Sequence, residues 1–261
     1  MTTTDAQTAP ATPAPSAARI AVRCRGVTKT YGSGASAVRA LRGVDLDVRR
    51  GELLMLVGPS GCGKTTLISV IAGVLDRDGG ECSVLGQDYG RMGGRERAKF
   101  RGENIGFVFQ AFNLIPTLNL AENVAVPLLI RGASMKEATA AASEVLSKVG
   151  LGDRTRDYPN RISGGQQQRV AISRALVHKP RLVVCDEPTS ALDHATGQRV
   201  MELLRQIAME GDLSLLVVTH DQRIFEFADR IAEMDDGAIK AVKTGEGHAV
   251  AAVHVDDENQ P

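Results

Sequence analysis

Apolar and polar residues alternate along two segments near the start of the chain, Ile20–Thr28 and Val38–Val48. In the second segment, Val44, Leu46 and Val48 fall on one side, and aspartates occupy the positions between them. A period of two is typical of β-strands that have one buried and one exposed face. The pattern therefore predicts a half-exposed β unit in the N-terminal part of the chain.

The pattern changes at Glu52–Val57, where apolar residues become continuous and lead into a glycine-rich turn. Continuous apolar runs are typical of parallel strands that are buried on both faces. Three further runs of this kind, each followed by polar residues, are Ile105–Phe109, Leu182–Cys185 and Leu215–Thr219. Because ligands of open α/β sheets bind at the carboxyl ends of the strands, we expect the active site at that edge of an α/β core.

Helical patterns separate the predicted core strands. Ser134 and Glu137 have the spacing of a capping box, and Gly150 is a suitable C-terminal stop for the helix that follows them. We therefore expect a helical lobe, about residues 111–161, inserted into the core. The segment Thr196–Met209 repeats apolar residues at helical spacing, which predicts an amphipathic helix.

We expect one large domain, residues 19–242. Residues 1–18 are rich in Ala, Thr and Pro and lack the cationic start and apolar centre of a signal peptide, which predicts a disordered leader. The segment Ile231–Val242, interrupted by Asp235–Gly237, predicts a closing β-hairpin. Residues 243–261 are expected to form a flexible tail.

The composition narrows the classes of partner. Lys plus Arg and Asp plus Glu both number 31, so the formal net charge is zero and nothing indicates a nucleic-acid-binding surface. The longest apolar runs are far shorter than the roughly 20 residues of a membrane-spanning helix. Any role at a membrane must then come through another chain. The four cysteines lack the spacing of a metal site or a disulfide framework, and we expect free thiols.

The glycine-rich turn after Val57 matches the complete P-loop pattern, and it lies between a predicted strand and an apolar-periodic helix. Such a turn lets backbone N–H groups converge on phosphate oxygens at a helix N-terminus. Lys64 is expected to bridge the β- and γ-phosphates, and Thr65 to supply a hydroxyl to Mg²⁺. The residues expected to bind ATP through this motif are Gly58, Pro59, Ser60, Gly61, Cys62, Gly63, Lys64, Thr65 and Thr66. By itself, the motif indicates only a nucleoside triphosphate.

Two adjacent carboxylates, Asp186 and Glu187, follow the buried strand that begins at Leu182. This is the Walker B arrangement. Asp186 is expected to orient Mg²⁺, because a hard cation prefers oxygen ligands. Glu187 is placed to polarise the attacking water as general base. An isolated Asp-Glu pair is more often part of a solvated loop, but next to a complete P-loop it favours catalysis.

The run from Ile162 to Arg169 (ISGGQQQR) resembles the signature motif of ABC ATPases, with Ile162 in place of the usual Leu. The residues that carry the motif are Ser163, Gly164, Gly165 and Gln166. They present a hydroxyl and backbone donors at a helix N-terminus, which makes a second phosphate-binding device. The chain then has two phosphate-binding devices but only one P-loop. This makes sense if the signature binds the nucleotide that another copy holds. The resemblance implies a homodimer in which two subunits pack head to tail.

Other positions resemble the family in the expected order. Tyr31 stands where the family has an aromatic residue that stacks on adenine, and Gln110 corresponds to the glutamine that contacts Mg²⁺ and water. Asp193 belongs to a segment that resembles the D-loop at the dimer seam, and His220 stands where the family has its switch histidine. Three of these residues also have a plain alternative: Tyr31 as a surface tyrosine, Gln110 as a loop glutamine and His220 as a structural histidine.

The resemblance implies a P-loop NTPase fold of the RecA-like type. Its core sheet is mostly parallel, with an N-terminal antiparallel β subdomain and an inserted α-helical subdomain. It also implies an ATPase that powers a separate permease, on the cytoplasmic side of the membrane as a peripheral subunit. The segment Phe109–Val124 is the candidate contact with the permease, although its apolar residues could instead be core of the helical lobe.

Within the family, the chain looks most similar to the ATPases of macrolide export, lipoprotein release and cell division. The resemblance rests on Phe109–Leu114, Leu120–Val124 and the three glutamines Gln166–Gln168. It implies a permease of the FtsX or MacB type and allows a membrane-fusion adaptor. Two alternatives stay open: a regulator of a cell-division or envelope-remodelling complex without transport, and a soluble ABC ATPase. A P-loop kinase or GTPase would not explain the signature.

Overall fold

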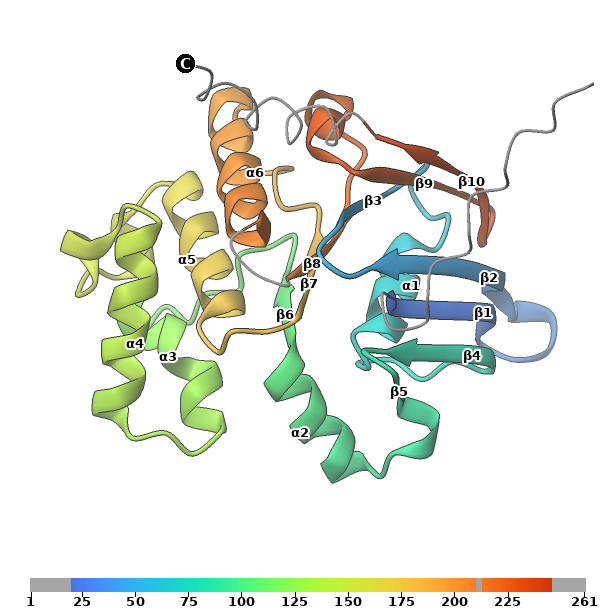
Figure 1. The fold of residues 1–261 in the computed structure, drawn as a ribbon, viewed down its shortest axis with the longest axis horizontal. Helices are drawn as coiled ribbons and strands as arrows, with labels where there is room; N and C mark the ends of the chain where they lie inside the picture. The colour runs from blue at the N-terminus through green and yellow to red at the C-terminus, as the bar shows by residue number, and fades with distance from the viewer. Residues whose placement is uncertain (1–19, 210–212, 246–261) are drawn as a thin grey trace, which may run out of the picture.

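The computed structural model describes residues 20–209 and 213–245 (Figure 1). The predicted leader and nearly all of the predicted tail lie outside these residues. Its first unit is an antiparallel four-stranded sheet with the order β2-β1-β4-β5. The strands are β1 (Ile20–Tyr31), β2 (Val38–Arg49), β4 (Gly79–Val84) and β5 (Gln87–Asp88). The predicted N-terminal β subdomain is therefore confirmed.

The second unit is a six-stranded sheet with the order β10-β9-β3-β8-β7-β6. All neighbouring strands are parallel except β9 and β10. The strands are β3 (Leu53–Val57), β6 (Ile105–Val108), β7 (Leu182–Asp186), β8 (Ser214–Val218), β9 (Arg230–Asp235) and β10 (Ala238–Thr244). The mostly parallel core is confirmed, and β10 runs two residues past Val242, where we expected the domain to end.

Helices cover both faces of the core sheet (Figure 1). On β3, Leu54 and Leu56 belong to the same apolar cluster as α1 and the N-terminal sheet, so α1 lies between the two sheets. Leu53 and Met55 belong to the opposite cluster, which contains residues of α5 and α6. The α-helices are α1 (Lys64–Ile71), α2 (Gly94–Asn104), α3 (Leu120–Ile130), α4 (Met135–Lys148), α5 (Gly164–Leu176) and α6 (His194–Met209). Burial on both faces explains why the strand sequence is continuously apolar.

A helical lobe with its own core stands at one end of the molecule (Figure 1, yellow and green). The predicted capping box of Ser134 and Glu137 is present at the start of α4. A second box, Asn119 with Glu122, starts α3. The lobe's core also includes Val170 of α5, which lies beyond residue 161, our expected end of the insertion. The helix α5, which begins within the predicted signature motif, therefore packs both in the lobe and against the core sheet.

The segment between Gly79 and Asn104 carried no prediction, yet it forms β4, β5 and α2. None of the residues of α2 is buried, so the helix has no apolar stripe that a sequence pattern could reveal. Short 3₁₀ turns occur at Gly34–Ser36, Tyr89–Arg91, Gly152–Arg154, Pro159–Arg161 and Gln222–Phe227. No helix within the described residues is long and apolar enough to cross a bilayer.

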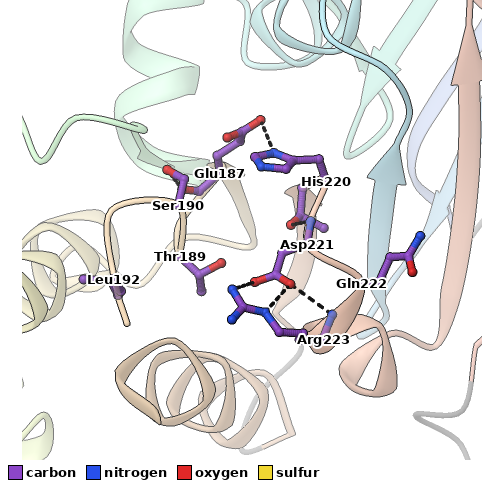
Figure 2. Close-up of a pocket in the computed structure, with 9 residues that line it drawn as sticks. Glu187, Thr189, Ser190, Leu192, His220, Asp221, Gln222 and Arg223 are labelled. Carbon is purple, nitrogen blue, oxygen red and sulfur yellow. Dashed lines mark hydrogen bonds and ion pairs between the residues drawn. The ribbon is translucent and has the colours of Figure 1, made fainter. Parts of the chain in front are cut away.

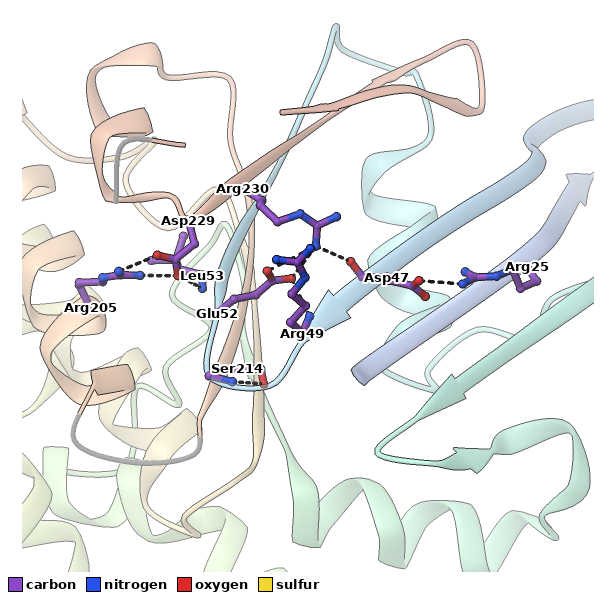
Figure 3. A network of polar contacts seen from close by, with 10 residues as sticks. Arg25, Asp47, Arg49, Glu52, Leu53, Arg205, Ser214, Asp229 and Arg230 are labelled. Carbon is purple, nitrogen blue, oxygen red and sulfur yellow. Dashed lines mark hydrogen bonds and ion pairs between the residues drawn. The ribbon is translucent and has the colours of Figure 1, made fainter. Parts of the chain in front are cut away.

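Buried charges join the two sheets where β2 leads into β3 (Figure 3). Glu52, which is 7% exposed, accepts from the backbone N–H of Arg49 at 2.6 Å and from Arg230 at 3.1 Å. Burial raises the pKa of Glu52 above its ordinary value even though Arg230 and the backbone N–H favour the carboxylate. Immediately before β9, Asp229 accepts hydrogen bonds from both terminal nitrogens of Arg205 and from the N–H of Leu53. These contacts fix the start of β3, the strand that carries the P-loop.

Candidate functional site

The P-loop connects the end of β3 to the start of α1, and two of its glycines have no substitute. A Cβ on Gly58 would lie 2.0 Å from the carbonyl oxygen of Met234, and one on Gly63 would lie 2.4 Å from that of Ala40. Both glycines also have positive φ, 152° and 104°. The turn therefore packs directly against the backbones of β9 and β2. Its shape depends on the absence of side chains at these two positions.

Lys64 is the first residue of α1 and is only 7% exposed. Its Nζ donates to the carbonyl oxygens of Gly58 at 2.8 Å and Pro59 at 2.7 Å, and lies 3.8 Å from the Sγ of Cys62. Within the described residues, Lys64 forms no ion pair with a carboxylate. A buried charge is unfavourable unless an opposite charge pairs with it. The loop thus fits a polyanionic ligand such as a nucleotide phosphate.

A cavity of about 570 Å³ opens above the P-loop. That volume is within the range of small-molecule sites. The residues that line it are Ala40, Gly58, Pro59, Ser60, Gly61, Gly63, Lys64, Thr65, Thr66, Gln110, Glu187 and His220. The structure therefore brings Gln110, Glu187 and His220, which follow three different strands, to the P-loop. Tyr31 is 45% exposed, and its hydroxyl lies 3.5 Å from the Oγ1 of Thr66, in the first turn of α1.

Thr65, which lines this cavity, contacts Asp186 at the end of β7. The hydroxyl of Thr65 donates to Oδ2 of Asp186 at 3.3 Å. Burial raises the pKa of Asp186 above its ordinary value, while the hydrogen bond from Thr65 and the charge of Lys64 act in the opposite direction. The hydroxyl, the carboxylate and the nearby amide of Gln110 are hard oxygen donors. They suit Mg²⁺, which binds one or two protein oxygens together with phosphate oxygens and water.

Glu187 and His220 face each other across the ends of β7 and β8 (Figure 2). Nδ1 of His220 lies 3.0 Å from Oε1 of Glu187, at hydrogen-bonding distance. Glu187 has a φ of 49°, in the left-handed region that few residues other than glycine adopt. Its N–H donates to the carbonyl oxygen of Val218 at 2.9 Å, and the hydroxyl of Ser190 donates to its carbonyl oxygen at 3.0 Å. Neighbouring groups thus hold Glu187 in a strained backbone conformation, a feature that clusters at active sites.

The turn after His220 holds residues that the sequence analysis did not single out (Figure 2). Arg223 donates to both carboxylate oxygens of Asp221 at 2.8 Å. Arg223 also lowers the pKa of Asp221 below its ordinary value. The N–H of Asp221 donates to Oγ1 of Thr219 at 3.0 Å. Ala40, from β2, is another unforeseen lining residue. Ala40 could not be foreseen from the sequence, because only the packing of distant strands brings it to the site.

The signature residues lie elsewhere in the same chain. Ser163 caps α5 and shares a capping box with Gln166. They line a second cavity, with Gly165, Arg169 and residues of α4 and α6. The described residues that line this cavity and the P-loop cavity are entirely different. One chain therefore does not bring its signature to its own P-loop.

Asp193 has a clear local role. Its Oδ1 accepts from the N–H of Thr196 at 3.0 Å, so it caps the start of α6. These hydrogen bonds from Thr196 lower the pKa of Asp193 below its ordinary value. Its neighbours Ser190 and Leu192 line a cavity beside Glu187 and His220 (Figure 2). The cap fixes the direction in which this segment leaves the site.

Comparisons with known proteins agree with this geometry. A family model described as ABC transporter matches residues 41–190. The lipoprotein-releasing system ATP-binding protein LolD of Chromohalobacter salexigens is 41% identical over 228 residues, 87% of this chain and 96% of that protein. The macrolide export ATP-binding/permease protein MacB of Agrobacterium fabrum is 42% identical over 219 residues, 84% of this chain and 34% of that longer protein.

A solved structure adds the nucleotide and the dimer. It is the dimeric ATP-binding cassette MJ0796 in a post-hydrolysis state, bound to ADP and Pi. The TM-score is 0.79 and the identity 40%, with 85% of this chain and 98% of that chain covered. A similarity of this extent confirms the predicted cassette fold, with its two sheets and inserted helices.

The position of Lys64 leads to a test of the phosphate site. We expect Lys64→Met to leave the melting temperature of the nucleotide-free protein unchanged or higher, because the change removes a buried ammonium whose hydrogen-bonded oxygens are neutral carbonyls. The same change should abolish the rise in melting temperature that ATP produces in the unmodified protein. Lys99→Met, at an exposed position of α2, is the control and should keep that rise. An ATP-dependent rise in Lys64→Met of the same size as in the control would contradict the assignment.

Proposed function

This chain belongs to the ABC transporter family as an ATP-binding subunit that hydrolyses ATP, and we propose that two copies use the hydrolysis to drive a separate membrane permease. The observation that carries the proposal is the separation of the P-loop from the signature within one chain. A second copy, packed head to tail, would place its signature over the nucleotide that the first copy holds. The dimeric cassette of the related structure supports this arrangement.

The P-loop cavity is the proposed ATP site, within an ATPase domain of residues 19–242. Lys64 and the backbone N–H groups of the loop hold the phosphates, and the N-terminus of α1 adds its positive dipole end. The half-exposed ring of Tyr31 offers a face on which adenine can stack. Ser163 and Gly165 of the second copy contact the γ-phosphate from the other side. ATP thus becomes part of the interface between the two copies.

Thr65, Asp186 and Gln110 are the residues that would hold Mg²⁺. The ion would neutralise charge that develops on the β- and γ-phosphates. Asp186 contributes a carboxylate whose pKa burial raises, so a nearby cation favours its charged form. Thr65 already contacts that carboxylate through its hydroxyl. The hydroxyl of Thr65 and the carboxylate of Asp186 therefore lie side by side, where both could bind the ion.

Glu187 is the proposed general base, and His220 the residue that orients it. The oxygen of a water molecule attacks the γ-phosphorus, its proton passes to the Glu187 carboxylate, and ADP leaves. The contact between His220 and Oε1 of Glu187 fixes that carboxylate at the edge of the cavity. Hydrolysis removes the covalently linked γ-phosphate that both copies bind, so the dimer can open.

We place the permease contact on the turn that precedes α3. In the candidate segment Phe109–Val124, Leu120 and Val124 are fully buried in the lobe's core and cannot contact a partner. Phe109 and Ile115 are 43% and 41% exposed. Asn123, fully buried, accepts from the N–H of Ile115 and donates to its carbonyl oxygen. The turn is therefore rigid and presents an apolar side chain outward.

Through this contact the subunit would sit on the cytoplasmic face of the membrane. The similarity to LolD and MacB supports a permease of the lipoprotein-release or export type. MacB joins an ATP-binding part and a permease in one protein, as its name states. This chain covers 96% of LolD, an ATP-binding protein, but only 34% of MacB, which supports a separate permease.

Glu187→Gln tests the catalytic assignment. An amide cannot take the proton of the attacking water, so we expect ATP hydrolysis to fall by about 10²-fold or more, the range of a general base. ATP should still bind, and the ATP-bound dimer should persist in size-exclusion chromatography. Glu202→Gln, at an exposed position of α6, is the control and should retain turnover. Normal hydrolysis by Glu187→Gln would refute the role of this residue.

Ile115→Asp tests the permease contact. A charge in the centre of an apolar contact should lower the fraction of the protein that sediments with membranes of its source cells, because the carboxylate loses its hydration there. Met209→Asp is the matched control, since Met209 is also apolar and 65% exposed but lies at the end of α6. Thermal unfolding of both variants verifies the fold. Equal membrane binding by the two variants would argue against this docking surface.

A further inference from the structure

We propose that Arg154 is a positioning residue for ATP hydrolysis, which sets the signature residue Ser163 through Gln166. The proposal rests on the proposed function of the signature at the nucleotide of the second copy. Arg154 ends the short 3₁₀ turn Gly152–Arg154, in the connection between α4 and α5. It lies outside the motifs that identify the family, and its contacts alone point to the role.

The guanidinium of Arg154 donates to three acceptors at once. Nε donates to Oδ2 of Asp157 at 2.8 Å, Nη1 to Oε1 of Gln166 at 3.1 Å, and Nη2 to the carbonyl oxygen of Arg161 at 3.3 Å. A guanidinium is planar and rigid, so three separate acceptors fix its position and orientation. The side chain is about one third exposed, and its ionic partner Asp157 is exposed to a similar degree. A solvent-accessible ion pair contributes little stability, which makes geometry the more informative property of Arg154.

Gln166 connects Arg154 to the signature residue Ser163. Its Oε1 accepts from Arg154 and also from the N–H of Ser163, at 2.9 Å. The N–H of Gln166 in turn donates to the hydroxyl oxygen of Ser163 at 3.3 Å. The two bonds between Ser163 and Gln166 form the capping box that begins α5. Arg154 therefore restrains the side-chain amide of Gln166, which holds the backbone N–H of Ser163 and so positions the residue that carries the signature hydroxyl.

The same turn is attached to the start of α3. The N–H of Leu120 donates to the carbonyl oxygen of Asp157, and the N–H of Ala121 donates to that of Thr155, both at 2.9 Å. The proposed permease turn ends where α3 begins. The turn that carries Arg154 thus connects the first turn of α3 to the signature.

A double-mutant cycle tests this proposal with full-length protein. The variants are Arg154→Met, Gln166→Ala and the two together, and the readouts are kcat for ATP, binding of a fluorescent ATP analogue and unfolding in urea. We expect Arg154→Met to lower kcat about tenfold, the effect of roughly 1.4 kcal/mol in the transition state. Analogue binding should be unchanged, because the P-loop holds the nucleotide. The double variant should be no slower than the slower single variant, because both changes interrupt one chain of contacts.

Two further variants separate positioning from folding. Arg154→Lys can still pair with Asp157 but cannot donate to all three acceptors, so we expect unfolding in urea to match that of the unmodified protein while kcat stays low. Arg156→Met, at an exposed position two residues away, is the control and should retain kcat. Full recovery of kcat by Arg154→Lys would show that only the charge matters and would overturn the proposal.

The remaining outcomes distinguish this proposal from the one on which it rests. Additive losses in the double variant would overturn the route through Gln166 and leave the signature's role intact. Ser163→Arg serves as the reference for that role, since a large side chain at this position should block contact with the second copy's nucleotide. Normal kcat in Ser163→Arg would overturn both proposals together.

Discussion

The buried ammonium of Lys64 is the feature on which the site depends. It lies inside a turn whose backbone packs so closely against β9 and β2 that Gly58 and Gly63 cannot carry a side chain. Its hydrogen-bond partners in the turn are neutral carbonyl groups, and it forms no ion pair within the described residues. A buried charge with neutral hydrogen-bond partners favours the binding of an anion. The turn is therefore organised for phosphate at the expense of its own stability, as functional sites often are.

A second constraint is the distance between the two phosphate-binding helix ends. The N-terminus of α1 opens into the P-loop cavity, whereas that of α5 opens into a cavity lined by other residues. Because α5 packs both in the helical lobe and against the core sheet, its start cannot turn toward the P-loop of the same chain. The shared site that we propose then requires two chains. In the proposed mechanism, ATP hydrolysis changes their association, and the lobe passes that change to a permease.

Much of this arrangement could be predicted from the sequence. Continuous apolar runs indicated the core strands, and the polar residues after them marked the edge at which Gln110, Glu187 and His220 meet. The capping box of Ser134 and Glu137 was visible because it depends on local spacing. In contrast, α2 has no buried face, and Ala40 reaches the site only because β2 passes beside the P-loop. The bonds of Arg154 could not be foreseen either, since they join a turn to a helix that begins ten positions later.

Complementation between two inactive variants tests most directly whether the catalytic site is shared by two chains. One variant carries Lys64→Ala and keeps its signature; the other carries Ser163→Arg and keeps its P-loop. In a mixed dimer, one site then combines an intact P-loop with an intact signature from the other copy. We expect neither variant alone to hydrolyse radiolabelled ATP in a single-turnover assay, and hydrolysis to return when the two are mixed. A mixture that stays inactive, although chromatography shows that mixed dimers form, would contradict a site shared between chains.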